Sequence, residues 1–333
     1  MSRFALWSHI VLCVLGLGLA WQAAHHERER TGGPSSVTLL DVEPAAIASL
    51  DYRWDKGTTR VRREGRQLLV EVDRELPPKA PPKSDADGDA APAVAAEPAR
   101  EKATIPAGKV VVGAIDAVAP LKTKRTLGVI AADRLGSMGL AEPQRSLTIT
   151  TARGRTLTLD IGDASYGAQG RYARVRGDDV VHLLEPAIVS GVEGSVDALL
   201  EKRPLPAEID AVRALAVRAG DRAGEWVHVD RDQPAKRRLA RRDEPNGKDD
   251  AATKLLGTLR GLRGTKLVDD AAKAGDAVAT FVVDLGDEGP LTLELVQRGD
   301  GSGHVVRAGP WAWELAATPV KELLDDVDAV FAP

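Results

Sequence analysis

The longest apolar stretch of the chain lies near its N-terminus. Phe4–Ala24 contains no Asp, Glu, Lys or Arg, and at a rise of about 1.5 Å per residue a helix of this length matches the apolar thickness of a bilayer. Trp7 and Trp21 lie near its two ends, where indole rings favour the membrane–water interface. The pattern predicts a transmembrane anchor over residues 1–26.

A cleaved signal peptide is the alternative interpretation of this stretch. Gly18 and Ala20 place small residues where signal peptidase reads them, but the apolar run continues to Trp21 and exceeds the usual apolar core of about 7–15 residues. Arg3 precedes the run, whereas the charges of residues 27–30 cancel. This asymmetry predicts a single-pass inner-membrane protein with a cytoplasmic N-terminus and a periplasmic or other extracytoplasmic body.

Beyond the anchor, short runs of alternating apolar and polar residues predict antiparallel strands. The predicted strands are Val37–Leu40, Thr59–Arg63, Gln67–Val72, Leu147–Thr151, Thr156–Ile161, Arg171–Arg176 and Val180–Leu184. Apolar residues at helical spacing predict one helix at Val110–Val118 and another around Val192–Leu200.

The same order of patterns recurs, shortened, in the second part of the chain. Ile47, Leu50 and Tyr52 are matched in spacing by Val212, Leu215 and Val217. The predicted elements that follow are strands Trp226–Val229, Thr280–Leu285, Leu291–Gln297, His304–Arg307 and Trp311–Leu315, and helices Ala251–Leu262 and Pro319–Phe331. We predict a tandem duplication of two mainly antiparallel, β-rich α+β modules with a few helices, at 37–205 and 206–333.

Two segments break the alternation. Residues 76–108 are rich in Pro, Ala and charge, and they bury too little apolar area to offset the entropy of ordering, which predicts a disordered insert. Gln233–Asp250 is a basic, Pro-containing stretch at the corresponding place in the second module. We expect both segments to be solvated loops.

Composition fits an exported globular body. The 333 residues are 43% hydrophobic and 28% charged, which is ample for packed cores. A net charge of -4 argues against a nucleic-acid partner. The single cysteine, Cys13, lies in the predicted anchor, so the body has no disulfide and no cysteine-based zinc site.

Several motifs of the first module resemble a known family. They are Gly139–Pro143, Leu157–Gly162, Tyr172–Arg174 with Val180–Leu183, and the junction Leu199–Leu205. With these motifs, the chain resembles the bacterial domain-of-unknown-function 4340 family, whose members carry one N-terminal span and repeated β-rich modules. The resemblance implies an envelope protein often encoded beside gliding-motility-type ABC transporter components, and it supplies no catalytic residues.

The second module departs from these motifs. It lacks the Gly-Leu-x-x-Pro element, has Leu295-Val296 in place of Ile161-Gly162, and adds two tryptophans. A ligand held at this turn of the first module would therefore not be held identically by the second.

The histidines do not form a metal-binding pattern. Three lie in or beside the anchor, and His182, His228 and His304 are isolated on predicted strands, whereas a zinc site needs three or four converging ligands. Asp85–Asp89 alternates carboxylates, but Ala96 stands where a calcium loop needs its bidentate Glu. We predict no metal and no cofactor, and we expect His182 or His228 to be half-buried.

Two groups of residues form the candidate interaction surface. They are the basic run Lys236, Arg237, Arg238, Arg241 and Arg242, and the pair Trp311 and Trp313. The basic run could contact anionic lipid, an acidic glycan or an acidic partner, although neighbouring carboxylates can balance it. The two tryptophans share one face of a strand, where core packing is the simpler interpretation.

The sequence supports two functional hypotheses. The first is a non-enzymatic, membrane-anchored accessory component that binds a permease or ATPase of an ABC-transporter-linked assembly. The alternative is an extracytoplasmic ligand binder or hydrolase acting on a cell-envelope glycan or peptide, because residues distant in sequence can converge in a site.

Overall fold

The computed structural model of the protein describes residues 36–65, 67–76, 99–167, 170–206, 211–231, 233, 237–268, 274–299, 301 and 303–332. The chain divides into two compact units between Leu199 and Leu200, which we call the first and second modules. The predicted anchor at 1–26 lies outside the described residues. Within those residues, no helix is long and apolar enough to cross a membrane.

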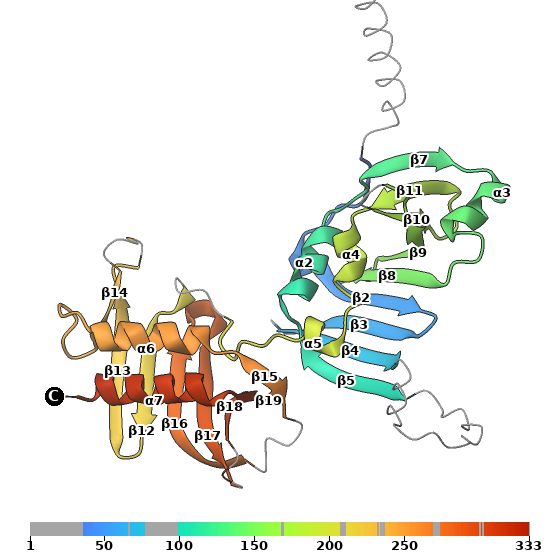
Figure 1. The fold of residues 1–333 in the computed structure, drawn as a ribbon. Coiled ribbons are helices and arrows are strands. Elements are labelled where there is room, and N and C mark those ends of the chain that lie inside the picture. Colours follow the sequence, from blue (N-terminus) through green and yellow to red (C-terminus); the bar gives the residue numbers. More distant parts are fainter. Residues whose placement is uncertain are drawn as a thin grey trace, which may run out of the picture. The chain divides into compact units, whose positions relative to one another are not determined.

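Both modules are mainly antiparallel β-sheet with a few helices, an α+β architecture (Figure 1). The strands of the first module are β1 (Thr38–Leu40), β2 (Ile47–Trp54), β3 (Gly57–Glu64), β4 (Gln67–Glu75), β5 (Arg100–Pro106), β6 (Leu121–Lys122), β7 (Arg125–Val129), β8 (Arg145–Thr151), β9 (Thr156–Ala164), β10 (Arg171–Val175) and β11 (Val180–Leu184). Its helices are α2 (Lys109–Val118), α3 (Ala132–Leu135), α4 (Pro186–Ser190) and α5 (Val196–Leu199), with 3-10 turns η1 (Pro44–Ala46) and η2 (Gly136–Met138).

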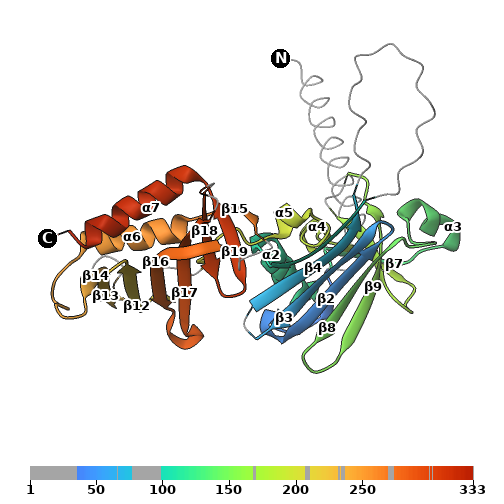
Figure 2. The same cartoon turned by 90° about the horizontal axis from the view of Figure 1, so that it is seen from below.

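The second module follows with β12 (Ala214–Ala219), β13 (Arg222–Val229), β14 (Arg238–Arg241), β15 (Gly264–Leu267), β16 (Ala274–Asp284), β17 (Pro290–Arg298), β18 (His304–Ala308) and β19 (Trp311–Leu315). Its helices are α6 (Asp250–Gly261) and α7 (Ala317–Val330), with the 3-10 turn η5 (Gly286–Glu288). Figure 2 shows α6 and α7 on the same side of this sheet.

The two main sheets share one topology over the described residues. Their strand orders are β5-β4-β3-β2-β8-β9-β10-β11-β7 and β14-β13-β12-β16-β17-β18-β19-β15, so they match strand for strand once the edge strand β5 is set aside. The register matches as well. Leu50 lies opposite Val61 and Ile149, and Leu215 lies opposite Trp226 and Val283.

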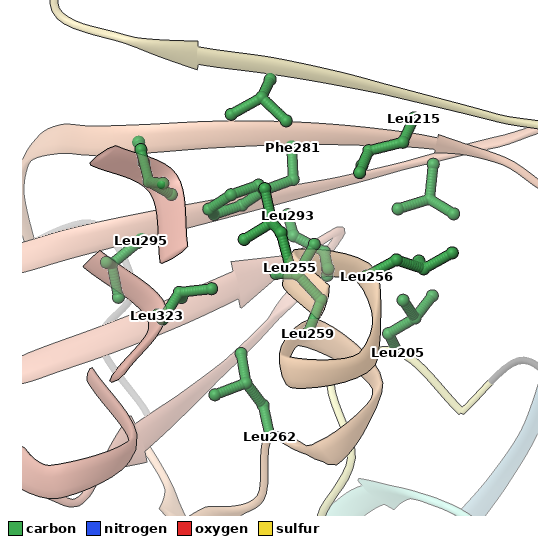
Figure 3. Packing of buried hydrophobic residues seen from close by; sticks show 14 of the residues in the cluster. Leu205, Leu215, Leu255, Leu256, Leu259, Leu262, Phe281, Leu293, Leu295 and Leu323 are labelled. Atoms are coloured by element: carbon green, nitrogen blue, oxygen red, sulfur yellow. The ribbon is translucent and has the colours of Figure 1, made fainter. Parts of the chain in front are cut away.

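The core of the second module forms between the sheet and its two helices. Helix α6 begins at Asp249, whose carboxylate accepts a hydrogen bond from the backbone N–H of Ala252 at 2.8 Å, a capping contact that stabilises the first turn. Its Leu255 and Leu259 are buried. Figure 3 shows them facing Phe281 and Leu293 of the strands.

A tryptophan links this core to both helices. Trp226 of β13 is fully buried, donates a hydrogen bond from Nε1 to Asp249 at 2.7 Å, and packs edge-on against Phe331 at a ring distance of 6.1 Å. A Cβ at Gly224 would lie 2.5 Å from the Trp226 ring. Only glycine therefore leaves room for this indole.

In the first module the helices pack closely through small residues. Helix α2 buries Val111, Ala114, Ile115 and Val118. A Cβ at Gly191, just after α4, would lie 2.5 Å from the Cβ of Ala114. The glycine thus allows the close contact between α2 and α4.

The prediction of solvated loops was wrong at two places, where the structure has a strand. Arg100–Pro106, at the end of the predicted insert, is strand β5 and pairs along β4, while residues 77–98 lie outside the described residues. Arg238–Arg241, inside the predicted basic loop, is strand β14 and pairs with β13. Both are edge strands that bury few apolar side chains, with Ile105 in β5 and Leu239 in β14, so they leave only a short apolar pattern in the sequence.

The helix expected around Val192–Leu200 is also shorter than predicted. The structure has α4 and α5 separated by a segment with Gly191 and Gly194, residues that interrupt helices because they cost conformational entropy.

A buried carboxylate joins the two helices of the second module. Asp326 of α7 is 3% exposed, lies 2.7 Å from Lys254 Nζ and accepts a 2.7 Å hydrogen bond from Thr258, both on α6. Burial alone would raise the pKa of Asp326, but the hydrogen bonds from Lys254 and Thr258 outweigh it and hold the pKa below its ordinary value.

We expect Asp326→Asn to destabilise the packing of α6 on α7 by about 1–3 kcal/mol, because Thr258 and Lys254 lose a charged acceptor. Hydrogen–deuterium exchange of α6 and α7 peptides in the full-length protein would measure this. Because the folded pKa is depressed, the contribution is present above the unfolded value of about 3.9 and is lost as the pH falls through the folded pKa.

The matched control is Lys321→Ala, which removes an exposed ion pair with Asp325 on α7 and should leave the exchange of both helices close to that of the wild type, because exposed ion pairs contribute little to stability. Unchanged exchange in Asp326→Asn at neutral pH would contradict the role assigned to this carboxylate.

Candidate functional site

The face of the first sheet opposite the helices carries mostly polar side chains near its first strands, whereas the same face of the second sheet carries small and apolar side chains with a few polar ones. In β2, Leu50 and Tyr52 are buried toward the helices, and because side chains alternate along a strand Asp51 and Arg53 point to the opposite face. We call the parts of these faces around β2–β4 and β12–β13–β16 the open faces.

A shallow groove of about 350 Å³ lies on the open face of the first module. It is lined by Asp51, Tyr52, Arg53, Thr58, Arg60, Glu71, Val72 and Asp73. Most of its charges form ion pairs: Arg60 pairs with Asp51, and Asp73 lies 2.9 Å from Arg100 and 3.4 Å from Lys102.

A groove of similar volume, about 360 Å³, lies on the open face of the second module. It is lined by Ala216, Val217, Arg218, Ala223, Gly224, Glu225, Thr280 and Val282. Arg53 lies opposite Thr58, and Arg218 lies opposite Ala223. The two grooves therefore occupy the same place in the shared topology.

The described members of the basic run contact other groups of the second module. Arg237 donates to the carbonyl of Arg231 at 3.0 Å, Arg238 pairs with Asp230, and Arg242 lies 3.1 Å from Glu225. Arg241 is exposed, with its guanidinium 5.8 Å from the centre of the Trp226 ring. Lys236 lies outside the described residues, and binding of an external partner by this run stays a prediction.

The two tryptophans belong to the core rather than to an exposed platform. Trp313 is 3% exposed and donates a hydrogen bond to the carbonyl of Glu201 at 2.9 Å. Trp311 is partly buried against the same core cluster. The structure therefore places them apart from the grooves, and the sequence correctly favoured core packing.

Two of the histidines on strands, His182 and His228, contact groups of their own module. His182 is buried 3.1 Å from the Thr126 hydroxyl, and burial lowers its pKa, so it is neutral near pH 7. His228 is half-buried, 2.9 Å from the carbonyl of Val212. Among the described residues, no group of three or more His, Cys, Asp or Glu side chains could hold a metal ion.

A charged cluster occupies the helix-side end of the first sheet. Glu193 lies 3.2 Å from Arg171 and 3.6 Å from Arg145. Burial raises the pKa of Tyr52, and the nearby Glu193 carboxylate raises it further, so the phenol stays protonated. Val217 takes the place of Tyr52 in the second module, which makes this cluster specific to the first.

Three of the motifs that carry the family resemblance, all except the junction Leu199–Leu205, lie together in space. Met138 and Leu140 form a small apolar cluster with Val181, against which Tyr172 packs. A Cβ at Gly162 would collide with the carbonyl oxygen of Met138. These motifs therefore fix the α3–η2 segment against the face of the sheet opposite α2.

The register explains why the second module lacks these motifs. Ile161 lies opposite Ala173 and Leu295 opposite Val306, so Val296 takes the position of Gly162. Its side chain would block a segment packed like η2. The absence of these motifs from the second module is thus explained by steric exclusion of such a segment.

A comparison with known protein families supports the family resemblance of the sequence. The sequence model of the family described as "Domain of unknown function (DUF4340)" matches residues 108–278, and the chain belongs to this family. The match begins just before α2 and ends within β16, so it overlaps both modules. No curated protein and no solved structure matches the chain.

The two grooves are not predicted from the sequence, although the sequence contains a signal for them. The apolar spacing that aligns Leu50 and Tyr52 with Leu215 and Val217 also aligns the next residues, which are arginine in both modules.

We expect Gly162→Ala to displace the α3–η2 segment, because the added Cβ cannot fit beneath the Met138 carbonyl. Hydrogen–deuterium exchange of residues 132–140 should rise, with a loss of about 1–3 kcal/mol typical of overpacking. Gly113→Ala is the control, since a Cβ at this α2 position meets nothing within 4 Å and alanine favours helix. Equal protection in both variants would refute the steric role of Gly162.

Proposed function

We propose that this protein is a non-enzymatic component of the cell envelope that binds other proteins of an ABC-transporter-linked assembly. In this proposal residues 1–26 anchor the chain in the inner membrane, with the N-terminus in the cytoplasm and both modules outside it. The partner is a permease or an ATPase component.

The observation that carries the proposal is the recurrence of an uncovered groove at the same place in both modules. Small-molecule sites bury most of their ligand in a concave pocket, whereas these grooves are shallow and lie on broad sheet faces. Such a surface suits a macromolecule that covers the surrounding strands as well as the groove.

The duplication and the membrane anchor also support a protein-binding role. Two related modules in one chain offer two related surfaces, and a membrane tether raises the effective concentration of both for a membrane partner. Binding that is weak for each surface alone then becomes sufficient.

The test is affinity purification of the full-length protein in mild detergent, followed by mass spectrometry, beside a form that lacks residues 1–26. We expect permease or ATPase subunits with the full chain and at least about tenfold less with the shortened form, because the tether supplies avidity.

Recovery of no transporter component by either form would overturn the transporter role. Binding of a cell-envelope glycan or peptide by the soluble modules would then favour the ligand-binding alternative.

A further inference from the structure

Each groove contains an arginine at the same position of the duplicated sheet. Arg53 lies opposite Thr58 and Ser146, and Arg218 lies opposite Ala223 and Thr280. Both arginines are exposed. Because their cross-strand neighbours are small, each guanidinium stands above the surface around it.

These two arginines differ from most charged groups around them. Arg60 is paired with Asp51, and Arg242 with Glu225. Among the described residues, neither the Arg53 side chain nor the Arg218 side chain forms a hydrogen bond or an ion pair. A guanidinium presents five donors in a planar fork that matches a carboxylate, so each of these two has its full donor set available.

The retention of arginine contrasts with changes at adjacent positions. Asp51 is replaced by Ala216, and Arg60 by Glu225, at equivalent places in the register. The charge pattern of the open face has therefore diverged between the modules, while the unpaired arginine and the groove around it remain in both.

The surroundings also restrict the chemistry of the partner. Asp51, Glu71 and Asp73 line the first groove with Arg53 and would repel a dense polyanion. In the second groove the other lining residues are small, polar or apolar, apart from Glu225, whose carboxylate lies 3.1 Å from Arg242. Isolated carboxylates on an otherwise neutral chain fit both settings.

We propose that Arg53 and Arg218 are the recognition residues of the open faces, and that each binds an Asp or Glu side chain of a polypeptide segment of a partner protein. This inference rests on the proposed function, because it assigns the chemistry of the protein partner. A polypeptide is the occupant because a shallow groove encloses too little of a small carboxylate, whereas a chain laid over the sheet also contacts the small residues beside each arginine.

The probe is a fluorescent Ala/Ser peptide with isolated Glu residues, titrated into the full-length protein in detergent and followed by anisotropy. The double variant Arg53→Ala/Arg218→Ala should raise the dissociation constant at least about tenfold, as expected for loss of charge-assisted hydrogen bonds. The single variants should have smaller effects, and the Gln version of the peptide should bind the wild type as weakly as the double variant binds the Glu peptide.

Lys321→Ala is the charge-matched control for the single variants, because it also removes one positive charge, from α7 on the helix side of the second module. It should bind the Glu peptide as the wild type does. Equal binding of the Glu peptide by the double variant, or of the Gln peptide by the wild type, would overturn the assignment. If free glutamate competes at the same concentration as the peptide, the ligand is a small carboxylate and not a polypeptide. This result would also overturn the assignment.

The outcome is separable from that of the transporter test. If the full chain and the double variant retain the same transporter subunits, the arginine assignment fails and the accessory role stands. If the peptide binds through both arginines but no transporter subunit is recovered, the carboxylate chemistry stands and the partner class is wrong.

Discussion

The structure depends on burial of one face of each main sheet beneath its helices. In the second module Leu255 and Leu259 pack against Phe281 and Leu293 of the sheet, and each fully buried side chain of this size contributes about 1.5–3 kcal/mol relative to exposure. This contact fixes the strand register, because a slip by one residue would turn the apolar side chains toward water. It also determines which face is left for other molecules.

Both modules meet this constraint with the same strand order but with different side chains. Trp226 stands at the position of Val61, and Trp313 at the position of His182. The indoles need space, which Gly224 provides beside Trp226 and Gly264 beside Trp313. Because close-packed interiors tolerate a large residue only with a compensating small one, the two cores differ in pairs of residues while their topology is the same.

The faces opposite the helices are under a different constraint. Over β9–β11 of the first module, Gly162 allows the η2 segment to cover the sheet, whereas among the described residues of each module no such segment covers its open face. Charged neighbours on these faces form ion pairs that contribute little to stability. They therefore change readily, and an arginine that appears in both modules without such a pair, as Arg53 and Arg218 do, points to recognition rather than to folding.

The sequence alone determined the α+β class and, through its motifs, the family. It also determined the helices around Ala114, Leu255 and Leu323 and the strands that bury an alternating apolar face, because periodicity records which side of an element meets the core. It missed β5 and β14, since each of these edge strands buries few apolar side chains and shows little alternation. Tertiary structure alone decided the ion pairs, the packing of η2 over Gly162 and the two grooves. These depend on which residues lie side by side on neighbouring strands, and the register that sets this comes from the packing of the whole sheet.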